Sequence, residues 1–252
     1  MKRIAHSIAC LWILLLVGCG GHVPPQQFIV LLDTSGSIEP GAQADAVKAI
    51  GDLAKQLHRG DSIAVIPITS DAENETEGAV IRFTVPTTRK AYDQDLRRFN
   101  NQMHDALQRL AADAAAHPGI ETDILGTLEL ARQELSASHS VNTGMIIVLS
   151  DFILEDQVHN FRTDPALANE TSARNLADQL AKERHFTLHA QWVFLGGLRS
   201  KELRSLSEAR RNAIRAFWDE YLRAAGAETQ YATDGPGLLA EFLRIRDESS
   251  SR

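Results

Sequence analysis

The chain has 252 residues, of which 44% are hydrophobic and 23% are charged, and this is the composition of an ordinary globular protein. Its formal net charge is −7, and it contains no block of lysines and arginines that would neutralise phosphates. These features argue against nonspecific nucleic-acid binding, and we expect no nucleic-acid partner.

The first 18 residues have the pattern of an export signal rather than of a folded element. Two basic residues near the start precede an uncharged apolar stretch, residues 8–17, which is about half of the ~20 residues that a membrane-spanning helix needs. The stretch leads into Leu-Val-Gly-Cys at residues 16–19, which resembles the lipobox of bacterial lipoproteins. That resemblance implies a lipoprotein signal peptide over residues 1–18, cleavage before Cys19, and a diacylglycerol on the Cys19 thiol. An ordinary secretory peptide with an incidental cysteine is the alternative.

The cysteine content agrees with lipidation. Cys10 lies inside the expected signal peptide, so cleavage leaves Cys19 as the single cysteine of the mature chain, and no intramolecular disulfide can form. Residues 19–27 then form the lipidated cysteine and a Gly/Pro-rich tether, whose eight residues after Cys19 reach at most ~26–29 Å. Gly20 stands where an Asp signals inner-membrane retention in enterobacterial lipoproteins. By this resemblance the mature protein belongs to the bacterial cell envelope, lipid-anchored in the membrane, and in a Gram-negative organism to the periplasmic side of the outer membrane.

From residue 28 onward, strands and helices alternate along the chain. Residues 28–32 and 145–149 are continuously apolar, which is typical of parallel strands that helices cover on both faces. The other expected strands are residues 62–69, 79–85, 186–195 and 229–232. The expected helices are residues 42–57, 92–116, 124–136, 172–184, 200–225 and 237–245. This order predicts one α/β domain over residues 28–246, with a doubly wound, mostly parallel central sheet between two layers of helices, and a disordered tail over residues 247–252.

Polar side chains follow both of the continuously apolar strands. The turn 33–37 (Asp-Thr-Ser-Gly-Ser) comes directly after the first, and Asp151 closely follows the second. In open α/β sheets, ligands bind beyond the carboxyl ends of the strands, where the strand order reverses, so these groups face one crevice if the two strands are neighbours. Two carboxylates and three hydroxyls form an all-oxygen set suited to Mg²⁺, with Mn²⁺ or Ca²⁺ also possible. The candidate metal ligands are Asp33, Ser35, Ser37, Thr122 and Asp151.

The order and spacing of these residues resemble the metal ion-dependent adhesion site of von Willebrand factor type A (vWA) domains. That family has Asp-x-Ser-x-Ser after the first strand, a Thr in a later loop and an Asp after the fourth strand. The resemblance implies a Rossmann-like vWA fold over residues 28–246. It implies that the hydroxyls bind the cation directly or nearly so, whereas Asp33 and Asp151 act largely through bound waters. It also implies a binding module without enzymatic activity, which captures a protein partner presenting an Asp or Glu.

Each part of this site also has a simpler interpretation. The turn 33–37 and Asp151 suit Asx turns or caps, and Thr122 suits a helix N-cap. The alternative functions are a metal-free vWA scaffold or assembly protein and a serine-dependent hydrolase with Ser35 or Ser37 as its nucleophile. The hydrolase is the weaker alternative, because the sequence has no Gly-x-Ser-x-Gly elbow.

Residues 152–171 show neither a helical nor a strand pattern. A loop of this length is unusual in a compact domain and is typically functional or mobile. Because it follows Asp151, we expect it on the metal side of the sheet, although a surface insertion without a role is the alternative. The candidate partner-contact residues in it are Glu155, Asp156, His159, Arg162 and Asp164.

Overall fold

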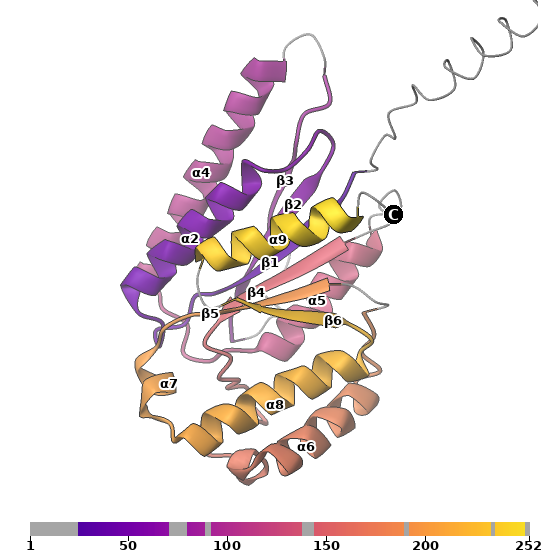
Figure 1. The fold of residues 1–252 in the computed structure, drawn as a ribbon. Helices are drawn as coiled ribbons and strands as arrows, with labels where there is room; N and C mark the ends of the chain where they lie inside the picture. The colour runs from indigo at the N-terminus through magenta and orange to yellow at the C-terminus, as the bar shows by residue number, and fades with distance from the viewer. Residues whose placement is uncertain are drawn as a thin grey trace, which may run out of the picture.

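The computed structural model describes residues 25–70, 80–88, 92–137, 144–188, 192–232 and 235–249, and within these ranges six strands form one open sheet (Figure 1). The strands are β1 (Gln27–Asp33), β2 (Ser62–Ile68), β3 (Ile81–Thr84), β4 (Gly144–Ser150), β5 (Trp192–Gly197) and β6 (Glu228–Ala232). The helices are α2 (Pro40–Ala54), α4 (Tyr92–Ala116), α5 (Ile124–Ala137), the 3-10 helix η1 (Pro165–Ala168), α6 (Glu170–Glu183), α7 (Lys201–Ser205), α8 (Glu208–Ala224) and α9 (Gly235–Ser249).

The strand order is β3-β2-β1-β4-β5-β6, in which β3 runs antiparallel to β2 and every other neighbouring pair is parallel. The strand order therefore reverses between β1 and β4, which lie side by side at the centre. The expected doubly wound, mostly parallel sheet is confirmed.

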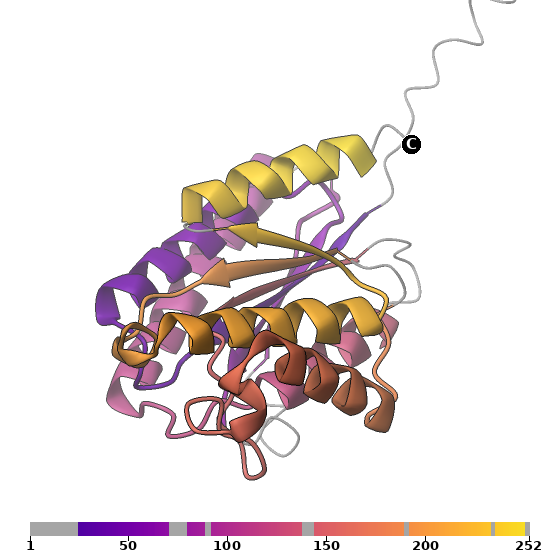
Figure 2. The ribbon, with the colours of Figure 1, turned by 60° about the horizontal axis from the view of Figure 1, so that its bottom comes forward.

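Helices cover both faces of the sheet, which explains why its central strands are apolar throughout. Successive side chains of a strand point to opposite faces. In β1, Ile29 and Leu31 belong to the core that includes α5, α6 and α8, and their neighbours in the strand belong to the core that includes α2, α4 and α9. Figure 2 shows the sheet lying between α9 and α8. Every residue of β1 and β4 is buried.

The strand expected over residues 186–195 is wrong in its first part. β5 begins at Trp192, and Phe186 and Leu188 are buried without belonging to a strand. Phe186 stacks on Tyr221 of α8, with ring centroids 5.4 Å apart. The apolar pattern of this segment therefore reflects packing against α8.

The single helix expected over residues 200–225 is also wrong, because α7 ends at Ser205 and α8 begins at Glu208. Leu206 has an extended backbone, and the hydroxyl of Ser207 accepts a hydrogen bond from the backbone N–H of Arg210. A serine that caps the following helix gives the backbone an alternative to continuing the preceding one. The break makes α7 a separate short helix after β5.

Both ends of the domain differ from the expected boundaries. α9 continues to Ser249, into the segment expected as a tail. At the other end, Gln26 is buried, and its backbone N–H donates to Asp61 Oδ1 at 2.9 Å, so the last residues of the expected tether belong to the fold. The expected signal peptide and Cys19 lie outside the described residues. Within the described ranges, no helix combines the length and apolar character needed to span a membrane.

Candidate metal-binding site

The two aspartates at the ends of β1 and β4 lie where the strand order reverses. β1 pairs in parallel with β4, and Leu32 lies opposite Leu149 at the end of the pair. The two strands are therefore neighbours, which is the condition for both carboxylates to face one crevice. Asp33 is 0% exposed and Asp151 is 2% exposed, so both carboxylates are held inside the crevice at the carboxyl ends of the strands.

Asp33 holds the turn that follows it. Its Oδ1 accepts the backbone N–H of Ser35 at 2.9 Å, and its Oδ2 accepts the hydroxyl of Ser150 at 2.6 Å. The first of these bonds is the Asx turn of the simpler interpretation, so the turn and the candidate site use the same residue. Both oxygens of Asp33 accept hydrogen bonds from within the protein. This arrangement suits a buried carboxylate that holds the turn in place rather than one that faces the pocket.

The hydroxyls of Ser35 and Ser37 point toward each other, and the hydroxyl of Ser37 also reaches Asp151. The two Oγ atoms are 2.9 Å apart, and Ser37 Oγ donates to Asp151 Oδ2 at 3.3 Å. The other oxygen of Asp151 accepts the backbone N–H of Ile153 at 3.0 Å. One chain of hydrogen bonds thus joins the end of β1 to the end of β4.

Thr122 reaches the same place through backbone pairing with the loop after Asp151. Its N–H donates to Glu155 O at 2.8 Å, and the Glu155 N–H donates back to Thr122 O at 3.2 Å. The side-chain cap at the start of α5 is made by Asp123, whose Oδ1 accepts the backbone N–H of Gly126 at 2.8 Å. The helix-cap interpretation therefore applies to Asp123 rather than to Thr122.

A small pocket of about 170 Å³ opens over these groups. Four of the five predicted ligands line it, and the fifth, Asp33, is fully buried. The lining residues are Ser35, Gly36, Ser37, Gly119, Ile120, Thr122, Asp151, Ile153, Glu155, Arg162 and Glu202.

The two buried aspartates are costly to ionise. Burial raises the pKa of Asp33, although hydrogen bonds from Ser150 and Ser35 oppose the shift. The pKa of Asp151 is raised to about 6, first by burial and then by the negative charge of Asp33, while hydrogen bonds from Ser200, Ile153 and Ser37 lower it. A nearby cation favours the ionised form of such carboxylates.

The donor set fits a hard divalent cation. Within the described ranges, no three His, Cys, Asp or Glu side chains form a metal-binding group. The candidate site differs from that pattern because it combines two carboxylates with three hydroxyls. Oxygen donors of this kind are the ligands that Mg²⁺, Mn²⁺ and Ca²⁺ prefer.

Sequence reasoning missed two serines that support the aspartates. Ser150 bonds to Asp33, and Ser200 bonds to Asp151 while its hydroxyl also accepts the backbone N–H of Leu203 at 2.9 Å. Both serines are fully buried. Ser150 could have been found, because it ends the apolar strand beside Asp151. Ser200 comes from the loop after β5, and only the fold brings it to the site.

The backbone beside Asp151 is held in an unusual conformation. Phe152 has a left-handed backbone with φ 63°. Its N–H donates to Ser150 Oγ at 2.9 Å, and its carbonyl accepts Trp218 Nε1–H at 3.0 Å. Such a conformation costs about 1–3 kcal/mol and persists where surrounding contacts enforce it. α8 therefore helps to fix the chain direction after Asp151.

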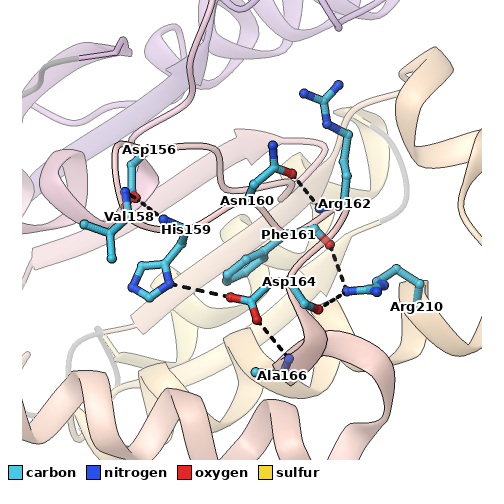
Figure 3. A network of polar contacts seen from close by, with 9 residues as sticks. All are labelled: Asp156, Val158, His159, Asn160, Phe161, Arg162, Asp164, Ala166 and Arg210. Atoms are coloured by element: carbon cyan, nitrogen blue, oxygen red, sulfur yellow. Dashed lines mark hydrogen bonds and ion pairs between the residues drawn. The ribbon is translucent and has the colours of Figure 1, made fainter.

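The loop after Asp151 is packed onto the domain (Figure 3). Phe161 is fully buried, and Arg210 of α8 donates to the carbonyl oxygens of Phe161 and Asp164. Asp164 Oδ1 accepts the backbone N–H of Ala166 at 2.8 Å and so caps η1. The expectation of neither helix nor strand over residues 152–171 is wrong, because η1 lies within the segment and α6 begins at Glu170.

The five candidate partner-contact residues divide into two groups. Glu155 and Arg162 line the pocket and form an ion pair with each other. The other three make contacts within the loop. Asp156 Oδ1 accepts the backbone N–H of His159 at 2.6 Å, and His159 Nδ1 lies 3.7 Å from Asp164 Oδ2 (Figure 3). The structure thus brings Glu155 and Arg162 to the pocket and uses Asp156, His159 and Asp164 to shape the loop.

Comparison with known proteins finds structural relatives and no sequence family. No protein-family model matches the chain, and no curated protein matches it. The D319A mutant of the PilB minor pilin from Streptococcus sanguinis has a TM-score of 0.54 and 14% identity, over 92% of this chain and 63% of that chain. The PilB minor pilin itself has a TM-score of 0.52 and 14% identity, over 91% of this chain and 62% of that one.

A von Willebrand factor type A protein from Catenulispora acidiphila has a TM-score of 0.45 and 19% identity, over 88% of this chain and 42% of that chain. This chain thus spans less than two thirds of the length of all three relatives. The likeness to PilB, together with the strand order, shows the fold, which is a doubly wound, Rossmann-like α/β fold.

Proposed function

We propose that this chain is a membrane-anchored vWA binding module that captures a protein partner through a divalent cation. The observation that carries the proposal is the convergence of two buried carboxylates and three hydroxyls at one pocket, at the carboxyl ends of two central strands. The residues that would hold the cation are Asp33, Ser35, Ser37, Thr122 and Asp151. A bound Mg²⁺, or Mn²⁺ or Ca²⁺ in its place, would supply an electrophilic position for an Asp or Glu of the partner.

The donor types suit capture of an acidic side chain. The hydroxyls of Ser35, Ser37 and Thr122 offer oxygen without adding negative charge, so the site keeps its attraction for a carboxylate from outside. Asp33 and Asp151 supply the negative charge that attracts the cation, and Asp33 is fully buried outside the pocket lining, where a partner's carboxylate does not contact it.

Two features of the surface favour a protein partner over a small molecule. The pocket of about 170 Å³ is smaller than the roughly 300–1,000 Å³ of typical small-ligand sites. Two large apolar side chains are exposed on the loops that border it, Ile120 at 91% and Val158 at 81%. A protein partner that covers the pocket would bury these two side chains as well.

The serine hydrolase has less support. Ser35 and Ser37 hydrogen-bond to each other and Ser37 to Asp151, and none of the described residues that line the pocket is a histidine that would serve as their base. A metal-free scaffold would bind no divalent cation, whereas the proposed module would, so metal binding separates these two functions.

A metal titration tests the proposed site. We expect the mature chain, residues 19–252 in detergent, to bind Mg²⁺ or Mn²⁺ in calorimetry, and Asp33→Ala or Asp151→Ala to lose most of that affinity. Asp178→Ala is the matched control, because its carboxylate is ion-paired with Lys182 on the surface of α6. If the wild type binds no metal, or if Asp33→Ala binds it equally well, the metal site is wrong and the scaffold is favoured.

The anchor is proposed from the lipobox resemblance, and it is tested at Cys19. Cys19→Ser should leave an uncleaved precursor or release soluble protein, whereas Cys10→Ser, inside the signal peptide, should fractionate with membranes as the wild type does. Recovery of Cys19→Ser in the membrane fraction as a mature protein would contradict lipidation. For a Gram-negative source we propose the outer membrane, facing the periplasm.

A further inference from the structure

Glu202 lies at the pocket, on the first turn of α7, and shares it with four of the candidate metal ligands. Its Oε2 is buried and has no hydrogen-bond partner among the described residues. A buried carboxylate oxygen without a partner is unfavourable, because it has lost water and gained nothing in exchange. Such an atom calls for a ligand that the chain itself does not supply.

Among the described residues that line the pocket, acidic side chains outnumber basic ones. Its acidic residues are Asp151, Glu155 and Glu202, and its basic residue is Arg162. Arg162 is ion-paired with Glu155. The carboxylates of Asp151 and Glu202, with that of Asp33 buried beside them, therefore leave three negative charges when all are ionised, most of which one divalent cation would offset.

The start of α7, which carries Glu202, is joined to the site at two points through its N-cap residue Ser200. Ser200 forms a β-bridge with Ile38, directly after the turn 33–37. Ser200 also hydrogen-bonds to Asp151 and caps α7. Glu202 follows two residues later, so the contacts that hold Asp151 also set the place of Glu202.

We propose that Glu202 is a further acidic residue of the metal site, which contributes its carboxylate to a divalent cation bound at the pocket. This inference rests on the proposed metal-dependent function. Within the described ranges, Asp33, Asp151 and Glu202 do not form a group of three acidic side chains that could hold a metal ion by itself, so Glu202 would act on the cation through bound water. An acidic side chain of a partner that enters the pocket meets Glu202 there and competes with it.

The test compares Glu202→Gln with Glu208→Gln in the mature chain, residues 19–252 in detergent. Glu208 lies in the first turn of the next helix and is exposed, so it controls for the loss of one acidic residue near a helix start. With Mn²⁺ as the probe, we expect Glu202→Gln to weaken binding in calorimetry roughly 10- to 100-fold, as supporting residues of metal sites do. Glu208→Gln should bind as the wild type does.

The unfolding temperature supplies a second measurement. If Glu202 had a purely structural role, the effect of Glu202→Gln on this temperature would be the same with and without metal. In chelator, Glu202→Gln should unfold at a higher temperature than the wild type, because one of the negative charges that repel each other at the pocket is gone. In saturating Mn²⁺ this advantage should shrink or invert. Equal Mn²⁺ affinity in Glu202→Gln and wild type, with binding lost in Asp33→Ala, would overturn this inference and leave the proposed function standing. Absence of Mn²⁺ binding by the wild type would overturn both.

Discussion

At the scale of single residues, the candidate site depends on serines that are not themselves candidate ligands. Ser150 and Asp33 are both fully buried, and the serine hydroxyl donates to the carboxylate. The same hydroxyl oxygen accepts the N–H of Phe152, where the backbone is left-handed. One side chain thus stabilises both the charge at the end of β1 and the bend after β4.

We expect Ser150→Ala to lower the free energy of unfolding by about 1–3 kcal/mol, since it leaves a buried carboxylate oxygen without its donor. It should also weaken Mg²⁺ binding, because Asp33 then holds its turn less firmly. Urea unfolding and calorimetry measure the two effects. The matched control is Ser136→Ala, whose hydroxyl bonds to Arg132 O on the exposed side of α5 and whose loss should change stability by no more than about 0.5 kcal/mol. Similar effects of the two substitutions would contradict the role given to Ser150.

The five candidate ligands could be proposed from the sequence because each lies next to a recognisable element boundary. A carboxylate directly after a continuously apolar strand has its position fixed by the strand. Ser200 and Glu202 have no such signal, because the sequence predicts a single helix over residues 200–225 and both residues lie at its start rather than at a strand end. Their place at the site follows from a β-bridge between distant loops, which leaves no periodic pattern in the sequence.

At the scale of elements, the start of α5 positions Thr122. The side chain of Asp123 accepts the backbone N–H of Gly126, and this contact leaves no space for a larger residue at that position. A Cβ on Gly126 would lie 2.1 Å from Asp123 Oδ2. By contrast, a Cβ on Gly51 in α2 would meet nothing within 4 Å.

We therefore expect two Gly→Ala substitutions within helices to have opposite effects. Gly51→Ala should raise the free energy of unfolding by about 0.5–1 kcal/mol, because alanine favours a helix. Gly126→Ala should lower it by about 1 kcal/mol, since the cap from Asp123 must be displaced. Gly126→Ala should also weaken Mg²⁺ binding through Thr122, and Gly51→Ala should not. Denaturant unfolding of both variants checks the signs, and stabilisation by both would show that the cap is unimportant.

Elements with strong periodicity were predicted well, and those shaped by tertiary packing were not. The helix expected over residues 92–116 has the bounds of α4, and the strands at the centre of the sheet follow the apolar runs. The break between α7 and α8 could not be predicted, because a serine such as Ser207 can either cap a new helix or lie within a continuous one. Phe186 and Leu188 have the composition of a strand but pack against α8, which composition cannot reveal.

At the scale of the whole molecule, the exposed apolar side chains are unevenly placed. Among the described residues, the large exposed hydrophobics are Ile120, Val158 and Tyr231. The first two lie on the loops that border the pocket, and Tyr231 lies on the edge strand β6. This distribution predicts that a partner contacts the pocket with an acidic side chain flanked by apolar ones.

A displayed peptide library selected on the Mg²⁺-loaded protein tests this prediction. The enriched peptides should contain an Asp or Glu near apolar residues, and chelator should remove the enrichment. The double variant Ile120→Ser/Val158→Ser should lose the enrichment while its Mg²⁺ affinity stays as in the wild type. Tyr231→Ser is the control, since it removes the other large exposed hydrophobic side chain among the described residues, which lies on β6. Enrichment that persists in the double variant would show that these two side chains are not part of the interface.

The direction of β1 has a consequence for how the module is oriented. Gln27 is its first residue and Asp33 its last, so the two ends of this seven-residue strand lie about 20 Å apart. A chain anchored through Cys19 would enter the domain beside Gln26, at the start of β1, and the pocket lies at the opposite end of that strand. The lipid would therefore hold one pole of the domain while the other projects into the aqueous compartment. Such a module would bind targets in or across the aqueous compartment rather than on the bilayer that carries it.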